Sequence, residues 1–191
     1  MKSADKILLI LDLDETLIFA TEQQLERKAD FIVFDYYVYK RPYLDEFLAY
    51  AQTNFIVAIW SSASDDYVME IVKNIIPTDY PLAFVWGNSR CTYRRNFYRD
   101  EGYIFNDSNR HYHFVKPLKK VRRRGYDLKR ILIVDDTPHK SQDNYGNAIY
   151  PSEYKGDLQD DELGKLERYL TTLQDKINVR RIEKRNWRSQ I

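Results

Sequence analysis

Three apolar runs in this chain end in acidic or hydroxyl side chains, and this pattern restricts the possible folds more than any other feature. The runs and the residues after them are 7–11 before Asp12, 55–60 before Ser61 and Ser62, and 131–134 before Asp135 and Asp136. Continuous hydrophobicity over a few residues is typical of strands that are buried on both faces, as in a parallel sheet covered by helices. A fourth apolar run, residues 82–86, predicts one more strand.

Helical patterns separate the apolar runs. Residues 42–50 begin with a proline and carry apolar side chains at helical spacing. Residues 64–75 begin with Ser64, a favourable N-cap, and residues 160–177 carry a stripe of leucines. Strands that alternate with helices are joined by right-handed crossovers, so the sequence predicts an α/β fold with a doubly wound parallel sheet.

The ends of the predicted strands indicate a single site. Ligands of such sheets bind at the carboxyl ends of the strands, where the polar residues of all three runs would meet. Any one strand can end in polar loop residues. Two Asp, two Ser and two further Asp at three separate ends favour a functional crevice instead.

The acidic residues at these ends suit a divalent cation. Asp12 and Asp14 are two residues apart, which places both carboxylates on one side of an extended strand end. Carboxylates this close repel one another unless a cation lies beside them. Mg²⁺ prefers oxygen ligands, water and substrate phosphate, whereas zinc would require His or Cys, which these motifs lack. The predicted metal residues are Asp12, Asp14, Asp135 and Asp136.

Composition argues against several classes of protein. Of the 191 residues, 43% are hydrophobic and 31% are charged, which is the balance of one globular domain. The net charge of +1 creates no overall field that attracts nucleic acid or anionic lipid. No apolar run reaches the roughly 18 residues of a membrane helix, and the first run lacks a cleavage site for secretion. Cys91 is the one cysteine and is expected to be a buried apolar residue, and a cytoplasmic location is expected.

The residues LDLDETL (11–17) resemble the DxDx[TV] signature of the haloacid-dehalogenase (HAD) superfamily. Further segments narrow the resemblance to its FCP/SCP-like branch, the transcription-factor-IIF-interacting and small CTD phosphatases, also called the NLI-interacting-factor family. These segments are KRPYLDEF (40–47), IWSSAS (59–64), VKPLKKV (115–121), ILIVDDTP (131–138) and DDELGKLERYL (160–170). The resemblance covers most of the chain, from about Lys6 to about Leu173.

The resemblance implies a phosphatase with the following catalytic residues. Asp12 would be the nucleophile that forms an aspartyl-phosphate. Asp14 would act as general acid and then general base, its backbone carbonyl would bind Mg²⁺, and Thr16 would steady it. Ser61 would hydrogen-bond a phosphoryl oxygen, and Lys116 would neutralise the phosphoryl group and the Asp12 carboxylate.

The same resemblance places Asp135 and Asp136 at the metal, with Asp136 expected as the direct ligand. Ser62 would join Ser61 in binding the substrate.

Two features depart from the family pattern. Ser61 stands where these phosphatases often carry Thr, a change that retains the hydroxyl. The segment before Lys116 is longer than in the small members, which leaves Lys119 and Lys120 as alternatives for the phosphate lysine. Any of the three would otherwise be a solvated lysine, because this stretch is densely basic.

Residues 88–114 predict a small β-rich insertion that is rich in Tyr and Phe. The segment is interpreted either as a hairpin packed by its own aromatic rings or as one wall of a peptide groove, with Arg94 or Arg95 near the phosphate. We favour the groove for the segment as a whole. His111 and His113 share one face of a strand but lack an evident third ligand, so they are expected at the surface.

The sequence predicts one HAD-like phosphatase domain over residues 1–175. No insertion of about 60 residues follows the first Asp pair, so a large cap domain is not expected. Residues 176–191 form a basic tail that could contact nucleic acid or an acidic partner. A solvated helix end is the favoured interpretation.

The expected function is hydrolysis of phosphomonoesters by a magnesium-dependent, monomeric phosphatase. The resemblance implies phosphoserine or phosphothreonine of a protein or peptide, and an open crevice suits a macromolecular substrate. Phosphorylated nucleic-acid ends and small phosphorylated metabolites remain alternatives, as does a catalytically inactive HAD-like binding module. An enzyme is favoured over the inactive module by the presence of Asp12, Asp14, Thr16, Ser61, Lys116 and Asp136.

Overall fold

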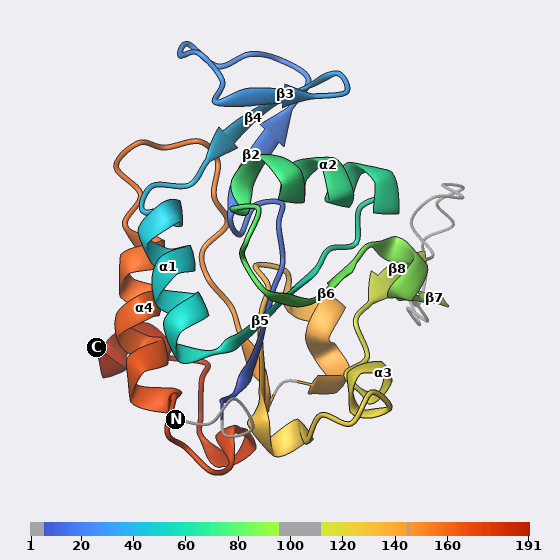
Figure 1. Cartoon of the computed structure of the whole chain (residues 1–191), viewed down its shortest axis with the longest axis vertical. Helices are drawn as coiled ribbons and strands as arrows, with labels where there is room; N and C mark the ends of the chain where they lie inside the picture. Colours follow the sequence, from blue (N-terminus) through green and yellow to red (C-terminus); the bar gives the residue numbers. More distant parts are fainter. Residues whose placement is uncertain (1–5, 96–111, 145) are drawn as a thin grey trace, which may run out of the picture.

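The computed structural model of this protein describes residues 6–95, 112–144 and 146–191. Its centre is a five-stranded sheet in which every pair of neighbouring strands is parallel (Figure 1). The order of the strands across the sheet is β10-β9-β1-β5-β6. The four predicted strands are confirmed, and the bounds of all five are β1 (Leu8–Leu11), β5 (Ile56–Trp60), β6 (Leu82–Trp86), β9 (Ile131–Val134) and β10 (Ala148–Ile149).

The register of the sheet brings the carboxyl ends of three strands level. Leu11 at the end of β1 lies opposite Ile59 of β5 and Val134 of β9. The chain leaves β1, β5 and β9 at the same edge, so the polar side chains that follow these strands meet there. Side chains of these strands are almost wholly buried, which explains their continuous hydrophobicity.

Helices cover both faces of the sheet, as in a doubly wound fold. Alternate strand residues pack on one face with α1 (Leu44–Asn54), α2 (Asp65–Ile75) and α4 (Glu162–Leu173). The other face packs on the segment of α3 (Lys119–Arg122), through Leu118 and Val121. Figure 1 shows α1 and α4 side by side and α3 apart from them. Within the described ranges, no helix is long and apolar enough to cross a bilayer.

The helix limits agree with the sequence in part. Ser64 caps α2 as expected, and its hydroxyl accepts the amide of Tyr67 at 3.4 Å. Helix α1 begins two residues later than predicted, because Tyr43 has a left-handed backbone with φ of 65°. Helix α4 ends at Leu173 rather than near residue 177, and Ile177 is 84% exposed. Short 3₁₀ helices complete the fold at Asn88–Arg90, Leu128–Arg130, Pro138–Asn144, Val179–Arg181 and Trp187–Gln190.

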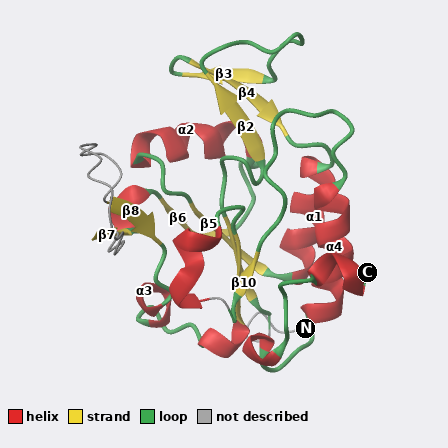
Figure 2. Ribbon diagram, turned by 180° about the vertical axis from the view of Figure 1, so that it is seen from behind, coloured by secondary structure: helices red, strands yellow, loops and turns green. Residues whose placement is uncertain are grey.

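Two small antiparallel sheets stand beside the central one (Figure 2). The first contains β2 (Ile18–Thr21), β4 (Tyr36–Lys40) and β3 (Phe31–Val33), and sequence analysis did not predict it. The second pairs β7 (Thr92–Arg95) with β8 (Tyr112–Val115), which confirms the expected β-rich insertion for its described strands. The first sheet, inserted between β1 and α1, is small, in agreement with the expected lack of a large cap.

Residues 176–191 are not the solvated helix end that the basic composition favoured. Val179 and Trp187 are buried, and the Trp187 ring lies 5.5 Å from the ring of Tyr169. The indole of Trp187 donates to the carbonyl of Tyr150 at 3.0 Å. Lys184 is also buried, because its ammonium donates to the carbonyls of Val179, Ile182 and Gly146. Apolar residues spaced among the charges therefore dock this segment on the domain.

Candidate active site

The loop after β1 carries Asp12 to the centre of the sheet edge. The Asp12 amide donates to the carbonyl of Val134 at 3.0 Å, so residue 12 still pairs with the strand beside it. The loop then turns sharply: the amide of Leu17 donates to the carbonyl of Leu13 at 2.8 Å. Glu15 adopts a left-handed conformation with φ of 56°, which is uncommon for a residue with a side chain. The Asp12 carboxylate is 1% exposed and accepts the Leu13 amide at 2.8 Å.

A buried lysine joins two of the carboxylates. The Nζ atom of Lys116 lies 2.7 Å from Oδ2 of Asp12 and 2.7 Å from Oδ2 of Asp135. All three side chains are at most 1% exposed. The amide of Lys116 donates to the carbonyl of Lys140 at 2.7 Å, which fixes the chain where it leaves β8. Charges removed from water to this degree are stable only when they are paired in this way.

A second lysine, which sequence analysis did not identify, also reaches the Asp12 carboxylate. The Nζ atom of Lys140 lies 3.4 Å from Oδ2 of Asp12, and the Lys140 side chain is 17% exposed. Lys140 lies in the 3₁₀ helix that follows the Asp135-Asp136 pair, so its closeness to the pair in sequence was the available signal. The Asp12 carboxylate therefore faces two ammonium groups.

Asp14 has a different environment from Asp12. The hydroxyl of Tyr67 donates to Oδ1 of Asp14 at 2.6 Å, and the hydroxyl of Ser61 donates to Oδ2 at 3.4 Å. The Ser61 hydroxyl also accepts the amide of Ala63 at 3.0 Å. Neutral donors from the ends of β5 and α2 thus orient Asp14, and Tyr67 is a further site residue that sequence analysis did not assign.

Asp12, Asp135 and Asp136 form a group that could hold a metal ion. One carboxylate oxygen from each lies within 4.8 Å of the others. Thr16 donates to Asp136 at 3.2 Å and accepts the Asp136 amide at 3.2 Å, so Thr16 positions Asp136 rather than Asp14. The Asp14 carboxylate is outside this group. Any metal ligand from Asp14 would be its backbone carbonyl, as the resemblance implied.

Burial and charge move the pKa values of the two loop carboxylates in opposite directions. Burial alone would raise the pKa of Asp12, but the charges of Lys116 and Lys140 outweigh it, so the pKa lies below its usual value. The pKa of Asp14 is raised, mainly by burial and in spite of the hydrogen bond from Tyr67. Asp12 is therefore held ionised, while Asp14 retains a proton more readily.

Neighbouring carboxyl groups also have raised pKa values. Burial and the charges of Asp14 and Asp136 raise the pKa of Glu15 to about 7. Burial and the charge of Asp12 raise the pKa of Asp135 to about 6, in spite of Lys116. Burial is the larger cause of both shifts, and the negative charge of the neighbouring carboxylates adds to it.

An aromatic pocket of about 330 Å³ adjoins Asp14. It lies between α2 and the three-stranded sheet, and its aromatic lining comes from Phe34, Tyr36 and Tyr67. The rings of Tyr36 and Tyr67 meet edge to face with their centres 6.0 Å apart. Its remaining lining residues are Asp14, Glu15, Ala20, Ala63 and Ser64. The pocket gives the site an apolar wall that sequence analysis did not predict.

The alternatives for the phosphate lysine do not reach the carboxylates. Lys119 is exposed, and Nζ of Lys120 donates to the carbonyls of Arg90 and Cys91 at 2.8 and 2.9 Å. Lys116 is thus the one of the three that lies in the cluster. Cys91 is buried, as expected.

The predicted substrate arginines are placed only in part. Arg94 forms an ion pair with Asp143, with Nη2 2.6 Å from Oδ2, and the structure does not bring it to the site carboxylates. The side chain of Arg95 and all of His111 lie outside the described residues. Ser62 is half-buried beside Ser61, and the His113 ring contacts His139 with centres 5.3 Å apart.

Comparison with known proteins identifies the group to which this geometry belongs. The profile of the family described as NLI interacting factor-like phosphatase matches residues 7–180. The chain belongs to this family. The match covers the loop after β1, Lys116 and the Asp135-Asp136 pair, so the resemblance seen in the motifs is confirmed.

Individual members of the NLI interacting factor-like family extend the match. The "CTD small phosphatase-like protein 2" of Dictyostelium discoideum is 31% identical over 93% of this chain and 29% of its own length. The human "Carboxy-terminal domain RNA polymerase II polypeptide A small phosphatase 1" is 29% identical over 86% of this chain and 58% of its own. This chain thus spans less than two thirds of the length of either relative.

A solved structure supports the fold. The fission yeast RNA polymerase II CTD phosphatase Fcp1, as an R271A variant bound to beryllium fluoride, aligns with a TM-score of 0.52 at 19% identity. The alignment covers 90% of this chain and 51% of the yeast chain. At this identity the comparison shows that the two chains share a fold.

Proposed function

We propose that this protein hydrolyses phosphomonoesters through an aspartyl-phosphate on Asp12. One observation carries the proposal: two carboxyl groups of the same loop have opposite surroundings, Asp12 beside two ammonium groups and Asp14 beside neutral hydroxyl donors. A nucleophile must be ionised, and a general acid must hold a proton. Asp12, beside two lysines, meets the first requirement, and burial of Asp14, which raises its pKa, suits Asp14 to the second.

Both steps balance with these two residues. In the first, an oxygen of Asp12 attacks phosphorus as the bond from phosphorus to the leaving oxygen breaks. The leaving oxygen takes the proton of Asp14. In the second, Asp14 removes a proton from water, whose oxygen attacks phosphorus and breaks the bond to Asp12. Phosphate is released and both carboxyl groups return to their starting states.

Positive charge and hydroxyl donors at the site would stabilise the transferring phosphoryl group. Lys116 and Lys140 both reach the Asp12 oxygen, so they lie where the phosphoryl oxygens would arrive. The Ser61 hydroxyl lies 3.4 Å from Asp14 and would donate to a phosphoryl oxygen. Fixed donors of this kind supply most of the catalysis in phosphoryl transfer, because the reaction depends mainly on positioning the reactants and stabilising the charge of the transition state.

The donor set fits Mg²⁺. Five carboxyl groups face two lysines at the sheet edge: Asp12, Asp14, Glu15, Asp135 and Asp136 against Lys116 and Lys140. An ion of this kind, when bound, polarises the phosphoryl group and allows an anionic nucleophile to approach an anionic substrate. Asp136 is the proposed direct ligand, because its described hydrogen-bond donors, the Thr16 and Thr137 hydroxyls, are neutral, and because it is partly exposed. Asp135 is already engaged by Lys116.

The proposed substrate is phosphoserine or phosphothreonine in a protein. The names of the relatives describe phosphatases of the RNA polymerase II carboxy-terminal domain, which supports a protein substrate. The aromatic pocket beside Asp14 would accept an apolar side chain next to the phosphorylated residue. Phosphorylated nucleic-acid ends and metabolites lack such a side chain. We also propose that the protein acts as a monomer, in the cytoplasm.

The first test is turnover of para-nitrophenyl phosphate by the wild type with Mg²⁺, by the wild type with EDTA, and by Asp12→Asn. Activity is expected in the first case alone. Phosphopeptides, phosphorylated oligonucleotides and sugar phosphates then rank the substrates. Clean, folded protein without turnover would overturn the proposal and favour an inactive binding module.

Metal binding has a readout that does not depend on turnover. Mg²⁺ is expected to raise the thermal unfolding temperature, since a ligand at about 100 times its Kd stabilises the folded state by about 2.7 kcal/mol. The shift should shrink in Asp136→Asn. An equal shift in wild type and variant would remove Asp136 from the metal site.

A further inference from the structure

A basic pocket of about 500 Å³ lies beside β6 and α3, apart from the residues of the proposed active site. Its lining contains four basic side chains and no acidic one: Arg90, Lys120, Arg123 and Arg124, together with Trp86 and Ser89. Within residues 6–95, 112–144 and 146–191, no carboxylate forms an ion pair with these four side chains. The pocket therefore presents concentrated positive charge that the described part of the chain does not neutralise.

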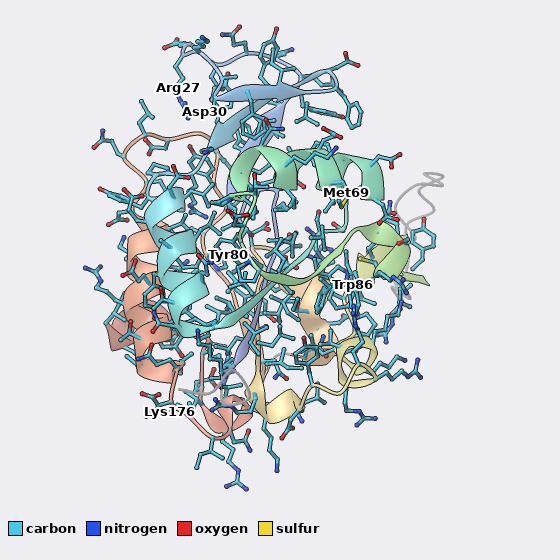
Figure 3. All side chains as sticks on the ribbon, viewed as in Figure 1. Arg27, Asp30, Met69, Tyr80, Trp86 and Lys176 are labelled. Atoms are coloured by element: carbon cyan, nitrogen blue, oxygen red, sulfur yellow. The ribbon has the colours of Figure 1, made fainter. Side chains whose placement is uncertain are left out.

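Two of the arginines are held in place by aromatic rings. The guanidinium carbon of Arg124 lies 5.5 Å from the Phe84 ring centre and 5.6 Å from that of Trp86. The guanidinium of Arg90 lies over the same Trp86 ring at 5.8 Å. Trp86, the last residue of β6 (labelled in Figure 3), is itself stacked on Phe84. Guanidinium groups positioned in advance lose less conformational freedom when they bind an anion.

Lys120 fixes the wall of the pocket. Its ammonium donates to the carbonyls of Arg90 and Cys91 at 2.8 and 2.9 Å, which ties α3 to the loop after β6. An ammonium has three N–H donors, so one remains for a ligand. Arg90, Arg123 and Arg124 make no side-chain hydrogen bond to any described residue, so their donors remain available as well.

The pocket shares two chain segments with the proposed active site. The carbonyl of Trp86 accepts the amide of Ser61 at 2.9 Å, so the end of β6 is hydrogen-bonded to the Ser61 segment. On the other side, Lys116 directly precedes the segment that carries Lys120. The pocket and the proposed active site therefore border the same chain segments.

We propose that this pocket binds a second phosphate group, carried by the same phosphorylated protein whose phosphoserine or phosphothreonine enters the active site. The identity of the substrate rests on the proposed function. Guanidinium groups bind phosphate through paired N–H donors, and arginine is the residue best suited to this contact. RNA fits the pocket less well. Trp86 of the lining and Phe84 stacked behind it are both buried and lie against the arginines, so neither ring offers an open face for a base to stack on.

Equilibrium binding of fluorescent peptides tests the proposal without turnover. All proteins carry Asp12→Asn to prevent hydrolysis. The probes are one singly phosphorylated serine peptide and a series in which a second phosphoserine lies at increasing spacing from the first. The pocket variant combines Arg90→Gln with Arg123→Gln. The control combines Lys119→Gln with Arg122→Gln, which removes the same charge from exposed residues of α3 that do not line the pocket. Thermal unfolding confirms that each variant folds.

At the best spacing, the second phosphate is expected to tighten binding about tenfold, which corresponds to about 1.4 kcal/mol. The pocket variant should lose this gain and the control should keep it. Three outcomes would overturn the proposal. The gain in affinity could survive in the pocket variant, it could be lost equally in the control, or it could be absent at every spacing. Single-stranded RNA of matched charge is a further probe. If this RNA binds more tightly than the peptides and loses that affinity in the pocket variant, the pocket is a nucleic-acid site and the proposal of a phosphate site is overturned.

The two proposals fail separately. If the wild-type protein shows no phosphatase turnover but the second phosphate still increases peptide affinity, the proposed function is wrong and the anion-binding pocket stands. Turnover without any gain would remove the pocket and leave the function.

Discussion

The hydroxyl of Tyr67 donates a 2.6 Å hydrogen bond to Oδ1 of Asp14, across the mouth of the aromatic pocket. This bond stabilises the ionised form of Asp14 and so opposes the effect of burial on its pKa. Burial and the charge of Asp14 raise the pKa of Tyr67 itself, so the phenol remains a donor throughout the neutral range. Tyr67 thus limits how firmly the proposed general acid holds its proton.

Tyr67→Phe is expected to move the basic limb of the pH–rate profile to higher pH, by up to about one unit. Loss of the donor removes a contribution that lowers the pKa of Asp14, so Asp14 stays protonated to higher pH. The measurement is kcat/KM for para-nitrophenyl phosphate across the pH range. Tyr36→Phe is the matched control, because its ring contacts Tyr67 but its hydroxyl does not bond Asp14. An unmoved limb, or a shift to lower pH, would contradict this account.

Lys140→Met is expected to lower kcat by about tenfold to a hundredfold, since a preplaced charge at the transferring phosphoryl group is worth a few kcal/mol. Lys140→Arg should recover part of the loss, because it restores the charge. Lys129→Met, at an exposed lysine outside the cluster, should behave as wild type. If only the unfolding temperature fell while kcat stayed constant, Lys140 would have a structural role alone.

Lys116→Met is expected to destabilise the fold by about 3–5 kcal/mol near pH 8, because it removes the ion pair of buried Asp135 and leaves buried Asp12 with only the more distant Lys140. Without the lysine, the folded-state pKa of Asp135, already raised, rises further, and that of Asp12 rises as well. The cost of burying their charges therefore grows as pH increases and shrinks as both groups become protonated. Urea unfolding at pH 8 and pH 5 should show a larger loss at pH 8. Lys119→Met is the control, and a loss independent of pH would contradict the pairing argument.

Arg41→Met is expected to cost about 3–5 kcal/mol of stability and to reduce activity as well. Arg41 is 1% exposed and binds both carboxylate oxygens of Asp160 at 2.8 Å. It also donates to the carbonyl of Thr16 at 2.9 Å, so it anchors the loop that carries the proposed catalytic residues. Denaturant unfolding and kcat measure the two effects. Lys73→Met removes an exposed ion pair with Glu70 and should change stability by less than about 1 kcal/mol.

Continuous apolar runs predicted the strands of the central sheet well, because a strand buried on both faces has no polar residue to obscure it. The inserted sheet was missed for the opposite reason. Its strands are short and partly exposed, and Ile32 and Phe34 are each 61% exposed, so hydrophobicity there does not follow burial. The tail from 176 to 191 was misjudged because its charges outnumber the few apolar residues, Val179 and Trp187 among them, that dock it.

The site was predictable where its residues directly follow strands. Asp12, Ser61 and Asp135 could be placed together from strand ends alone. Lys116 was assigned only through the family motifs, and Lys140 and Tyr67 were not assigned at all. The side chains of Lys140 and Tyr67 reach the site from helical segments whose orientation depends on tertiary packing, which a pattern of spacing does not reveal.

The strand order has a consequence for how the protein gains activity during synthesis. Strand β1 emerges first, yet it lies between β5 and β9, which are made later. The charge of Asp12 therefore remains unpaired until Lys116 and Lys140, which lie far along the chain, have been synthesised. Contacts over such separations form slowly, because long loops must close first. Recovery of turnover after refolding should thus report completion of the whole sheet, and a ribosome-bound chain that ends before residue 140 should be inactive.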